Sequence, residues 1–309
     1  MLPERNIAIL LATYNGADFI DEQLDSIARQ DWPLVDVWAS DDGSADATVE
    51  KLAAWQARWR KGAFRILEGP RRGYVENFRS MMANGAVDAA YVAFSDQDDI
   101  WDENKLSTAV RKLEEIAPTH SAMYCGRTRL VESDGTRRGA SPLFSRAPNF
   151  GNAIVQSIGG GNTIVLNRTA FGLVRESARR ASFVSHDWWC YQIVAGAGGR
   201  VLYDPVPRIG YRQHGGNLIG ENQGWRARLK RIRGLAEGRF AAWNATNIEA
   251  LEACRDLLDE NGRRTLDGFI AARQARPLES AHKLWRYGIH RQTRLSNVAL
   301  YVAALLGKL

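Results

Sequence analysis

Cysteine is scarce in this chain of 309 residues. Cys125, Cys190 and Cys254 are far apart, odd in number and form no Cys-x-x-Cys pair. We therefore expect neither a disulfide framework nor a cysteine-based zinc site. This cysteine usage best fits a reducing compartment.

Long apolar runs and nucleotide-binding glycine loops are also missing. No run reaches the ~18 apolar residues that a membrane span needs. The apolar segment 7–12 is too short for the core of a signal peptide. No Gly-x-Gly-x-x-Gly motif follows that segment, and no Gly-x-x-x-x-Gly-Lys-Ser/Thr loop occurs. We therefore expect a cytoplasmic protein that lacks both of these phosphate-binding loops.

The positive charge is confined to the last quarter of the chain. The net charge is +6, yet residues 224–309 hold 16 Lys or Arg and 8 Asp or Glu, so residues 1–223 carry a net charge of −2. An acidic main part argues against nucleic acid as its partner. The contrast predicts a main domain at 1–223 and a basic, mostly helical extension at 224–309.

The extension interleaves tryptophan with its basic residues, at Trp225, Trp243 and Trp285. Basic and aromatic residues on amphipathic helices suit an anionic membrane surface, so we expect peripheral binding at the inner face of the cell membrane. A solvated helical face and packing between subunits of an oligomer are the alternatives. Near the end, apolar residues fall at helical spacing on one face, namely Leu295, Val298, Ala299, Val302, Leu305 and Leu306.

Short apolar runs alternate with helical patterns in the first 100 residues. We predict helices that begin at Asp18 and Asp46, each acting as a cap, and a helix over 75–86. The alternation predicts an α/β fold with a mainly parallel, Rossmann-like sheet covered by helices on both faces. The expected strands are 7–12, 35–40, 64–68 and 89–95.

A polar loop follows each of these strands. The loops are 13–16, 41–44, 69–73 and 96–99, and two of them are strongly acidic. Ligands of parallel sheets bind beyond the carboxyl ends of the strands, where such loops meet. The sequence therefore predicts one site at this edge.

Asp96, Asp98 and Asp99 would repel one another after a buried strand. A divalent cation such as Mg²⁺ resolves this, since it uses one or two carboxylates together with substrate phosphates. Helix capping by Asp99 or Asp102 is the alternative for those two residues.

Three further features have competing interpretations. Residues 41–44, Asp-Asp-Gly-Ser, form either a simple turn or a contact to the N3–H of a pyrimidine base. Asp187, next to His186, is either a helix cap or the group that takes a proton from a sugar hydroxyl. His214, in a glycine-containing loop, is either a ligand of the metal or diphosphate or a structural residue.

These motifs, in this order, resemble family 2 glycosyltransferases of the GT-A fold. The segment Phe-Ser-Asp-Gln-Asp-Asp-Ile-Trp at 94–101 is especially similar to rhamnosyltransferase-type members that build O-antigen, capsule or cell-wall polysaccharides. The resemblance covers about residues 5–220. It implies an inverting, metal-dependent transferase in which Asp187 is the general base.

The resemblance also implies a set of binding residues. Asp96 and Asp98 match the Asp-x-Asp motif that holds Mg²⁺ or Mn²⁺, with Asp98 the direct ligand and His214 a further candidate. Nucleotide contacts are expected from Thr13, Tyr14, Asn15, Asp41 (to the base), Asp42, Arg72 and Asp96. The sugar pocket is expected to contain Gly160, Asn162, His186 and Trp188.

The implied reaction moves a sugar from a nucleotide diphosphate donor to a hydroxyl group. We expect dTDP-L-rhamnose as donor, with UDP-sugars as the alternative, and a glycan or polyprenyl-linked glycan as acceptor. A nucleotidyltransferase resembling nucleotide-sugar pyrophosphorylases would need a basic loop after the first strand, and residues 13–17 hold no Lys or Arg. A non-catalytic carbohydrate-binding protein of the same fold is the third interpretation.

Overall fold

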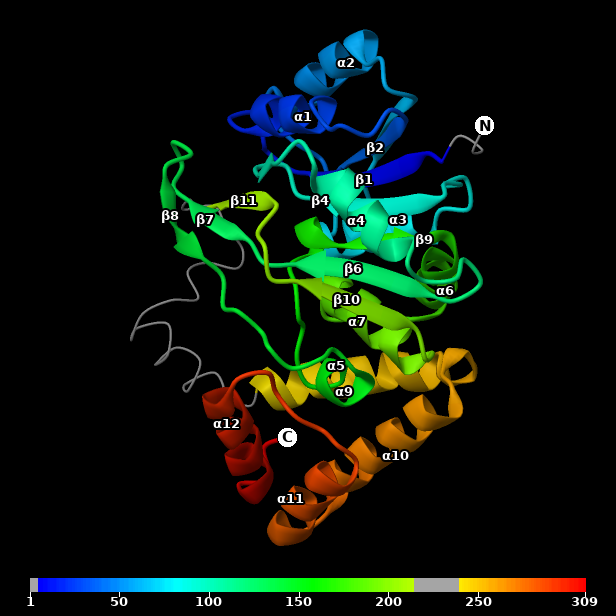
Figure 1. Cartoon of the computed structure of the whole chain (residues 1–309), viewed down its shortest axis with the longest axis vertical. Coiled ribbons are helices and arrows are strands. Elements are labelled where there is room, and N and C mark those ends of the chain that lie inside the picture. The colour runs from blue at the N-terminus through cyan, green and yellow to red at the C-terminus, as the bar shows by residue number, and fades with distance from the viewer. Residues whose placement is uncertain (1–4, 214–238) are drawn as a thin grey trace.

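A seven-stranded sheet forms the centre of the molecule (Figure 1). The computed structural model describes residues 5–213 and 239–309. The strands of this sheet are β1 (Ile7–Thr13), β2 (Val35–Asp41), β3 (Phe64–Glu68), β4 (Tyr91–Ser95), β6 (Ala122–Gly126), β9 (Val165–Asn167) and β10 (Arg200–Asp204), in the order β10-β6-β9-β4-β1-β2-β3. All neighbours are parallel except β9, which runs antiparallel to β4 and β6.

Helices cover both faces of this sheet because its central strands are apolar on both sides. In β1, Ile7, Ile9 and Leu11 belong to one buried cluster, and Ala8 and Leu10 belong to the other. The first cluster is covered by α1 (Ile20–Ala28), α2 (Thr48–Arg58) and α4 (Lys105–Leu113). The second is covered by α3 (Tyr74–Ala83), α6 (Arg168–Arg180) and α7 (His186–Gly196). The predicted mainly parallel sheet between two helical layers is confirmed.

A smaller sheet stands beside the main one, at the left of Figure 1. Its strands are β5 (Ile100–Trp101), β11 (Ile209–Arg212), β7 (Arg129–Val131) and β8 (Arg137–Ala140), in that order. The chain continues from β8 through the short helix α5 (Phe150–Ala153) and a 3₁₀ turn at Gly161–Thr163. This sheet and the segment after it line one side of a cavity, and the loops that follow β1 and β2 line the other side.

Several predicted helix starts are wrong. Helix α1 has Phe19 at its N-cap without a side-chain bond, so Asp18 does not cap it. The helix after β4 has Asn104 at its N-cap, so neither Asp99 nor Asp102 caps it. Asp46 lies one residue before the N-cap of α2, where its carboxylate accepts hydrogen bonds from the backbone N–H and hydroxyl of Thr48.

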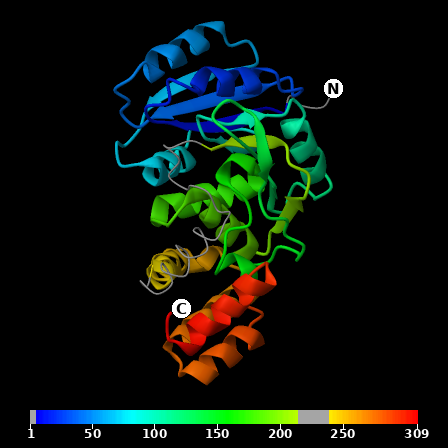
Figure 2. The ribbon, with the colours of Figure 1, turned by 90° about the vertical axis from the view of Figure 1, so that its left-hand side faces the viewer.

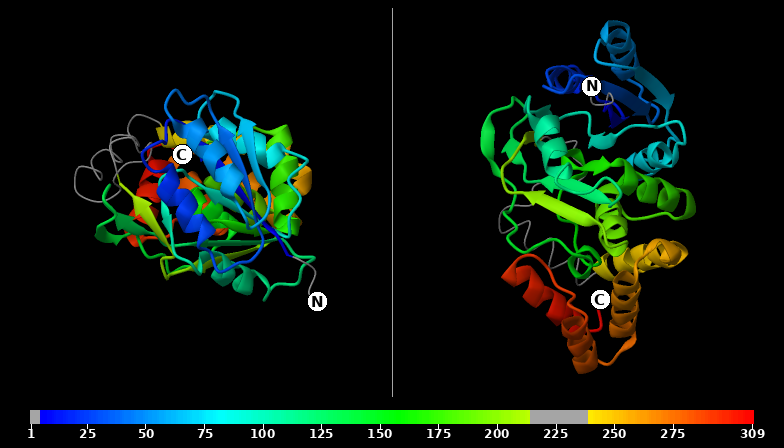
Figure 3. Two further views of the ribbon diagram at one scale, coloured as in Figure 1. Left: turned by 90° about the horizontal axis from the view of Figure 1, so that it is seen from above. Right: turned by 45° about the vertical axis from the view of Figure 1, so that its right-hand side comes forward.

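The C-terminal helices stand at the end of the molecule away from α2 (Figures 2 and 3). They are α9 (Arg239–Ala253), α10 (Glu260–Gln274), α11 (Pro277–Arg286) and α12 (Arg294–Leu305), with a 3₁₀ turn at Arg255–Leu257. Leu251 and Phe269 lie in the same apolar cluster as Trp189 of α7. The extension is helical, as predicted, and it shares a core with the sheet. The predicted boundary at 223/224 lies outside the described residues.

None of the described helices is both long enough and apolar enough to cross a bilayer.

Candidate active site

A cavity of about 1020 Å³ opens at the carboxyl ends of β1, β2 and β4. Its lining includes the predicted site residues Thr13, Tyr14, Asp42, Asp96, Asp98, Gly160, Asn162, His186 and Asp187. The predicted gathering of polar loops at this sheet edge is therefore confirmed. Asn15, Asp41, Arg72 and Trp188 do not line the cavity, and His214 lies outside the described residues.

Gln97 ties the loop after β1 to the loop after β4. Its side-chain oxygen accepts the backbone N–H of Tyr14 at 2.8 Å, and its amide nitrogen donates to the carbonyl of Tyr14 at 3.0 Å. A Cβ atom at Gly16 would lie 2.3 Å from the same amide oxygen. Gly16 therefore leaves the space in which Gln97 joins the two loops.

The carboxylate of Asp41 is fully used inside the protein. One oxygen accepts the backbone N–H groups of Gly43 and Ser44, and the other accepts the hydroxyls of Thr13 (2.9 Å) and Ser44 (2.6 Å). A carboxylate has about four acceptor sites, and these four bonds fill them. Asp41 therefore fixes its own loop, and Asp42 faces the cavity; a direct contact of Asp41 with the nucleobase stays a prediction.

Asp42 connects its own loop to the loop after β3. Its two oxygens each accept one bond at 2.7 Å, from the backbone N–H groups of Arg71 and Gly73. Arg71 has a positive φ of 58°, and it lines the cavity. The arginine selected from the sequence, Arg72, instead lies outside the cavity, 3.8 Å from the carboxylate of Glu76.

The loop after β4 places three carboxyl groups close together, those of Asp96, Asp98 and Asp99. Burial, followed by the charges of Asp98 and Asp187, raises the pKa of Asp96 to about 7. Burial, followed by the charges of Asp98 and Asp96, also raises the pKa of Asp99 well above its usual value, although the amide of Asn162 (2.6 Å) and the backbone of Arg212 form hydrogen bonds with its carboxylate. This loop is held from behind by Arg212, whose side chain is 2% exposed and donates to the backbone carbonyl of Asp98 at 2.9 Å.

Asp96 and Asp98 fit a hard divalent cation. Both line the cavity, and the pKa of Asp96 is raised first by burial and then by repulsion from Asp98 and Asp187, which a cation would relieve. Mg²⁺ binds through one or two carboxylates plus substrate phosphates, so two protein ligands suffice. No group of three His, Cys, Asp or Glu side chains suited to a metal occurs among residues 5–213 and 239–309.

Asp187 lies in the first turn of α7 and lines the same cavity. The hydroxyl of Ser157 donates to its carboxylate at 3.1 Å. Ser185, not Asp187, occupies the N-cap position, so the capping alternative is wrong. Tyr74 also lines the cavity; burial, together with the charges of Asp187 and Asp96, raises its pKa to about 12.

His186 is buried at the back of the cavity, with its ring stacked on Phe78 at a centroid distance of 3.8 Å. Neither ring nitrogen has a hydrogen-bond partner among the described residues. Burial lowers the pKa of His186 to about 4, so the ring is neutral at pH 7. A Cβ atom at Gly161 would lie 1.9 Å from Nε2, so only glycine leaves room for this ring.

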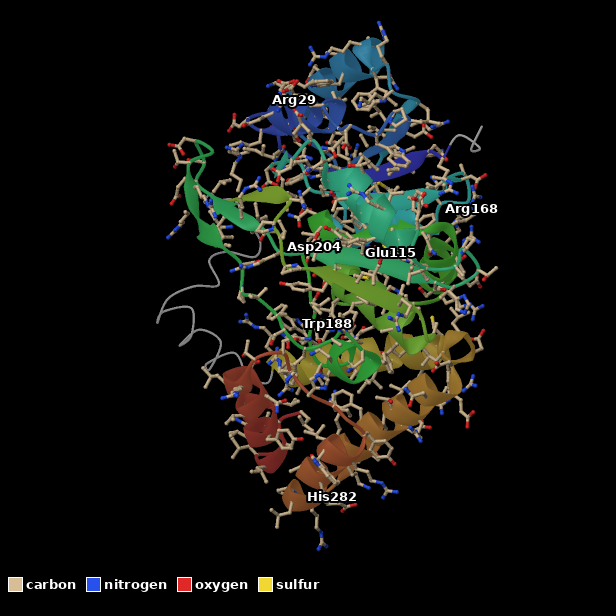
Figure 4. All side chains as sticks on the ribbon, viewed as in Figure 1. Arg29, Glu115, Arg168, Trp188, Asp204 and His282 are labelled. Carbon is tan, nitrogen blue, oxygen red and sulfur yellow. The ribbon has the colours of Figure 1, made fainter. Side chains whose placement is uncertain are left out.

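Trp188 does not line the pocket in which the sequence placed it. The residue, labelled in Figure 4, is 6% exposed and donates its indole N–H to the carbonyl of Ala153 at 2.6 Å. Consecutive side chains of a helix point in different directions, so Asp187 faces the cavity while Trp188 faces α5. The predicted contact of Trp188 with a sugar is therefore not supported.

The cavity also contains residues that the sequence analysis missed. Phe144 and Tyr203 line it with ring centroids 5.8 Å apart, and Arg71, Tyr74 and Ser157 line it elsewhere. Phe144 comes from an irregular segment, so no periodic pattern marks it. The segment Arg-Arg-Gly after a strand indicated that an arginine could line the cavity, but it did not indicate which of the two arginines does.

Solved structures first define the class of fold. Staphylococcus aureus TarS 1–349 in complex with UDP-GlcNAc matches with a TM-score of 0.56 at 17% identity, over 91% of this chain and 89% of that one. The mannosyltransferase PcManGT of Pyrobaculum calidifontis, in complex with GDP-Man and Mn²⁺, matches with a TM-score of 0.52 at 17% identity, over 100% and 89%. The chain has the GT-A fold with a helical C-terminal region.

Sequence comparison then defines the family. The sequence model of Glycosyl transferase family 2 matches residues 8–180. dTDP-rhamnosyl transferase RfbG of Shigella flexneri is 28% identical over 252 residues, 77% of this chain and 83% of that protein. The putative teichuronic acid biosynthesis glycosyltransferase TuaG of Bacillus subtilis is 28% identical over 178 residues, 55% and 65%. The chain belongs to glycosyl transferase family 2 and is a nucleotide-sugar glycosyltransferase.

Proposed function

We propose that this chain is an inverting, metal-dependent transferase that moves L-rhamnose from dTDP-L-rhamnose to a hydroxyl of a polyprenyl-linked glycan. The observation that carries the proposal is the presence of Asp96, Asp98 and Asp187 in one cavity. The similarity to the Shigella dTDP-rhamnosyl transferase over most of both chains supports the donor. The alternatives of a nucleotidyltransferase and a non-catalytic binding protein have no observation in their favour.

Asp98 and Asp96 would hold Mg²⁺ or Mn²⁺ together with the diphosphate of the donor. A bound divalent cation supplies charge stabilisation to the leaving nucleotide diphosphate. The Mn²⁺ in the complex of the Pyrobaculum mannosyltransferase supports this assignment. His214 stays a candidate ligand from the sequence.

The nucleotide would occupy the part of the cavity lined by the loops of β1, β2 and β3. Asp42 has one bond on each carboxylate oxygen from the protein, so it keeps capacity to accept the N3–H of a thymine or uracil ring. Thr13 and Tyr14 line this part, and Arg71 brings a cation toward it. Asn15 would act indirectly, because its side-chain oxygen accepts the backbone N–H of Ala45.

The chain's own catalytic group would be Asp187. Its carboxylate takes the proton of the acceptor hydroxyl while that oxygen bonds to the anomeric carbon and the bond from this carbon to the phosphate oxygen breaks. Attack opposite the leaving group inverts the anomeric configuration. Ser157, which donates to Asp187, would hold the carboxylate in place.

His186 would contact the transferred sugar as a neutral hydrogen-bonding group. Both of its ring nitrogens lack a partner among the described residues, and unpaired buried polar atoms are costly. A sugar hydroxyl would provide the missing bond. Gly160 and Asn162, which line the same region, would shape this pocket.

A donor panel tests the proposal. Thermal unfolding is measured with dTDP-L-rhamnose, UDP-GlcNAc and GDP-mannose, each with and without Mg²⁺ or Mn²⁺. We expect the largest rise in Tm with dTDP-L-rhamnose plus metal, and slow metal-dependent hydrolysis of that donor. A rise of Tm with another nucleotide sugar alone would overturn the donor, and a rise without metal would overturn metal dependence.

A further inference from the structure

Helix α12 exposes an apolar face that no described part of the chain covers. Its buried side consists of Leu300, Ala303 and Ala304. On the opposite side five large apolar residues are exposed, and at 3.6 residues per turn they fall within an arc of about 100°. These residues, here called the α12 stripe, are Leu295 (70% exposed), Val298, Val302, Leu305 and Leu306 (65%).

The rim of this stripe is positively charged. Arg294 and Lys308 lie at its two ends, and no charged residue lies between them. Residues 276–309 as a whole hold six Lys or Arg and one acidic residue, Glu279. The neighbouring helix α11 leaves Leu278 and Trp285 exposed, on the same side as His282, which Figure 4 labels at the end of the molecule.

We propose that the α12 stripe docks into the interfacial region of an anionic lipid bilayer. An apolar helix face rimmed by Lys and Arg is suited to headgroups of negative charge above acyl chains. At 12 residues α12 is about 18 Å long, too short to span a bilayer but suited to lying along its surface. A second copy of the chain on the stripe would bring the same cations against one another, which disfavours self-association.

Hydrogen bonds connect the start of α12 to the segment that lines the cavity. Gln292, just before α12, is 5% exposed and exchanges two hydrogen bonds of 3.3 Å with the backbone of Arg146. Arg146 follows a segment in which Ser141, Pro142 and Phe144 line the cavity. Figure 1 shows this segment running from β8 past the start of α12 to α5. The docked helix would therefore bring this segment close to the membrane.

This placement gives the proposed acceptor a physical route. A glycan on a polyprenyl anchor would reach the Phe144 side of the cavity while its lipid stays in the bilayer. The docking itself is independent of the donor; only this purpose rests on the proposed lipid-linked acceptor. The contact differs from attraction by the basic tail alone, because apolar insertion survives salt that screens charges.

A fluorescent probe at one position of the stripe tests the docking. The three native cysteines are fully buried, so a thiol-reactive, environment-sensitive dye would label an introduced cysteine selectively. Val302→Cys (native side chain 47% exposed) is compared with Val49→Cys on α2 (42%), at the far end of the molecule. With phosphatidylglycerol-containing vesicles we expect a blue shift at position 302 and none at 49, including at high salt.

A triple variant tests the energetic importance of the stripe. Leu295→Gln, Val298→Gln and Leu306→Gln together keep helix-forming residues at exposed positions. We expect vesicle binding to weaken about tenfold or more, given the apolar area removed, with no change in the Tm rise that a nucleotide-sugar donor causes. Val49→Gln combined with Val206→Gln is the matched control, because both positions are exposed and apolar.

Three results would overturn the proposal. These are equal vesicle binding by the triple variant, a dye shift at position 302 that needs protein concentration but no vesicles, and a wild-type dimer that the triple variant dissociates without losing vesicle binding. The donor panel fails or succeeds without reference to any of these results, so the two proposals are tested separately.

Discussion

The dipeptide Asp-Asp occurs twice in this enzyme near the carboxyl end of a parallel strand, at 41–42 after β2 and at 98–99 after β4. In the loop after β2, the carboxylates of Asp41 and Asp42 accept six hydrogen bonds from the protein. In the loop after β4, Asp99 accepts hydrogen bonds from the side chain of Asn162 and from the backbone of Arg212, and burial, followed by the charges of neighbouring carboxylates, raises the pKa of Asp96. Hydrogen bonds from the protein fill the carboxylate of Asp41 in the first loop, whereas in the second loop burial and neighbouring carboxylates raise the pKa values of Asp96 and Asp99.

This difference assigns different tasks to similar sequences. Backbone N–H groups surround the β2 loop because Gly43, Arg71 and Gly73 bend the chain around it, at φ of 95°, 58° and 88°. No residue of the β4 loop, 96–99, has a positive φ, and we propose that a cation bound with the substrate balances the charge of this loop. The comparison predicts that substitution of Asp41 in the first loop acts mainly on folding and that substitutions in the second loop act on catalysis.

The largest effect is expected for Asp187, which joins the second group of carboxylates in the cavity. Asp187→Asn should lower the rate of transfer about a thousandfold, because the general base is lost. Binding of the donor, measured by its effect on Tm, should stay the same. Asp134→Asn, at an exposed turn, is the matched control. Transfer within a factor of two of the native rate would contradict the role of Asp187.

Asp98→Asn should lower transfer about a hundredfold or more, because the leaving group loses charge stabilisation. The rise in Tm that a donor causes in the presence of Mg²⁺ or Mn²⁺ should disappear, whereas Tm without ligand should not fall. A drop in Tm without ligand would place Asp98 with the structural carboxylates and remove the distinction between the two loops.

The sequence predicted the edge of the sheet better than the direction of each side chain. The four strands with loops at 13–16, 41–44, 69–73 and 96–99 followed from hydrophobic pattern and turn residues, and all four lie where expected. The alternation of residues along a strand cannot predict whether the side chain of Asp41 or that of Asp42 faces the cavity. This depends on the hydroxyl groups of Thr13 and Ser44, which donate hydrogen bonds to Asp41. For the same reason, the sequence could not predict that Arg71 lines the cavity and Arg72 does not.

The C-terminal region shows the opposite limit of sequence patterns. The spacing of Leu295, Val298 and Val302 correctly indicated one apolar helix face. A helix face of this kind usually packs into a core, yet this one is exposed, while Leu300 and Ala304 on the other side are buried. Which of two apolar faces is buried depends on contacts with distant segments, and local spacing contains no such information.

Asp41→Ala should destabilise the fold by about 2 kcal/mol, because it leaves two backbone N–H groups and two hydroxyls without their acceptor. Urea unfolding measures this change in the free energy of unfolding. Ser44→Ala, which removes only one of the donors to Asp41, should cost less. If the Asp41→Ala variant were as stable as the native protein but inactive in transfer, this result would indicate that Asp41 binds the nucleotide directly.

The smallest expected effect concerns the pH dependence of stability in metal-free protein. The pKa of Asp96 is about 7 in the folded chain, against 3.8 for an unperturbed Asp. Between these values the folded chain binds more protons than the unfolded chain, so this group makes the free energy of unfolding fall as pH rises from about 4 to about 7. Because Asp96 is partly exposed in the cavity, the total change should be only about 1 kcal/mol.

Asp96→Asn should remove that decline, since the amide does not titrate, and should stabilise metal-free protein at pH 8. Mg²⁺ should have the same effect on the native protein, because a cation beside the carboxylates favours their ionised form. Asp42→Asn gives the comparison from the other loop and should leave the decline in place. Asp99, whose pKa is also raised, keeps its own share of the decline in this variant. A decline of the same size in Asp96→Asn and in the native protein would mean that Asp96 does not contribute, and the contrast between the two loops would fail.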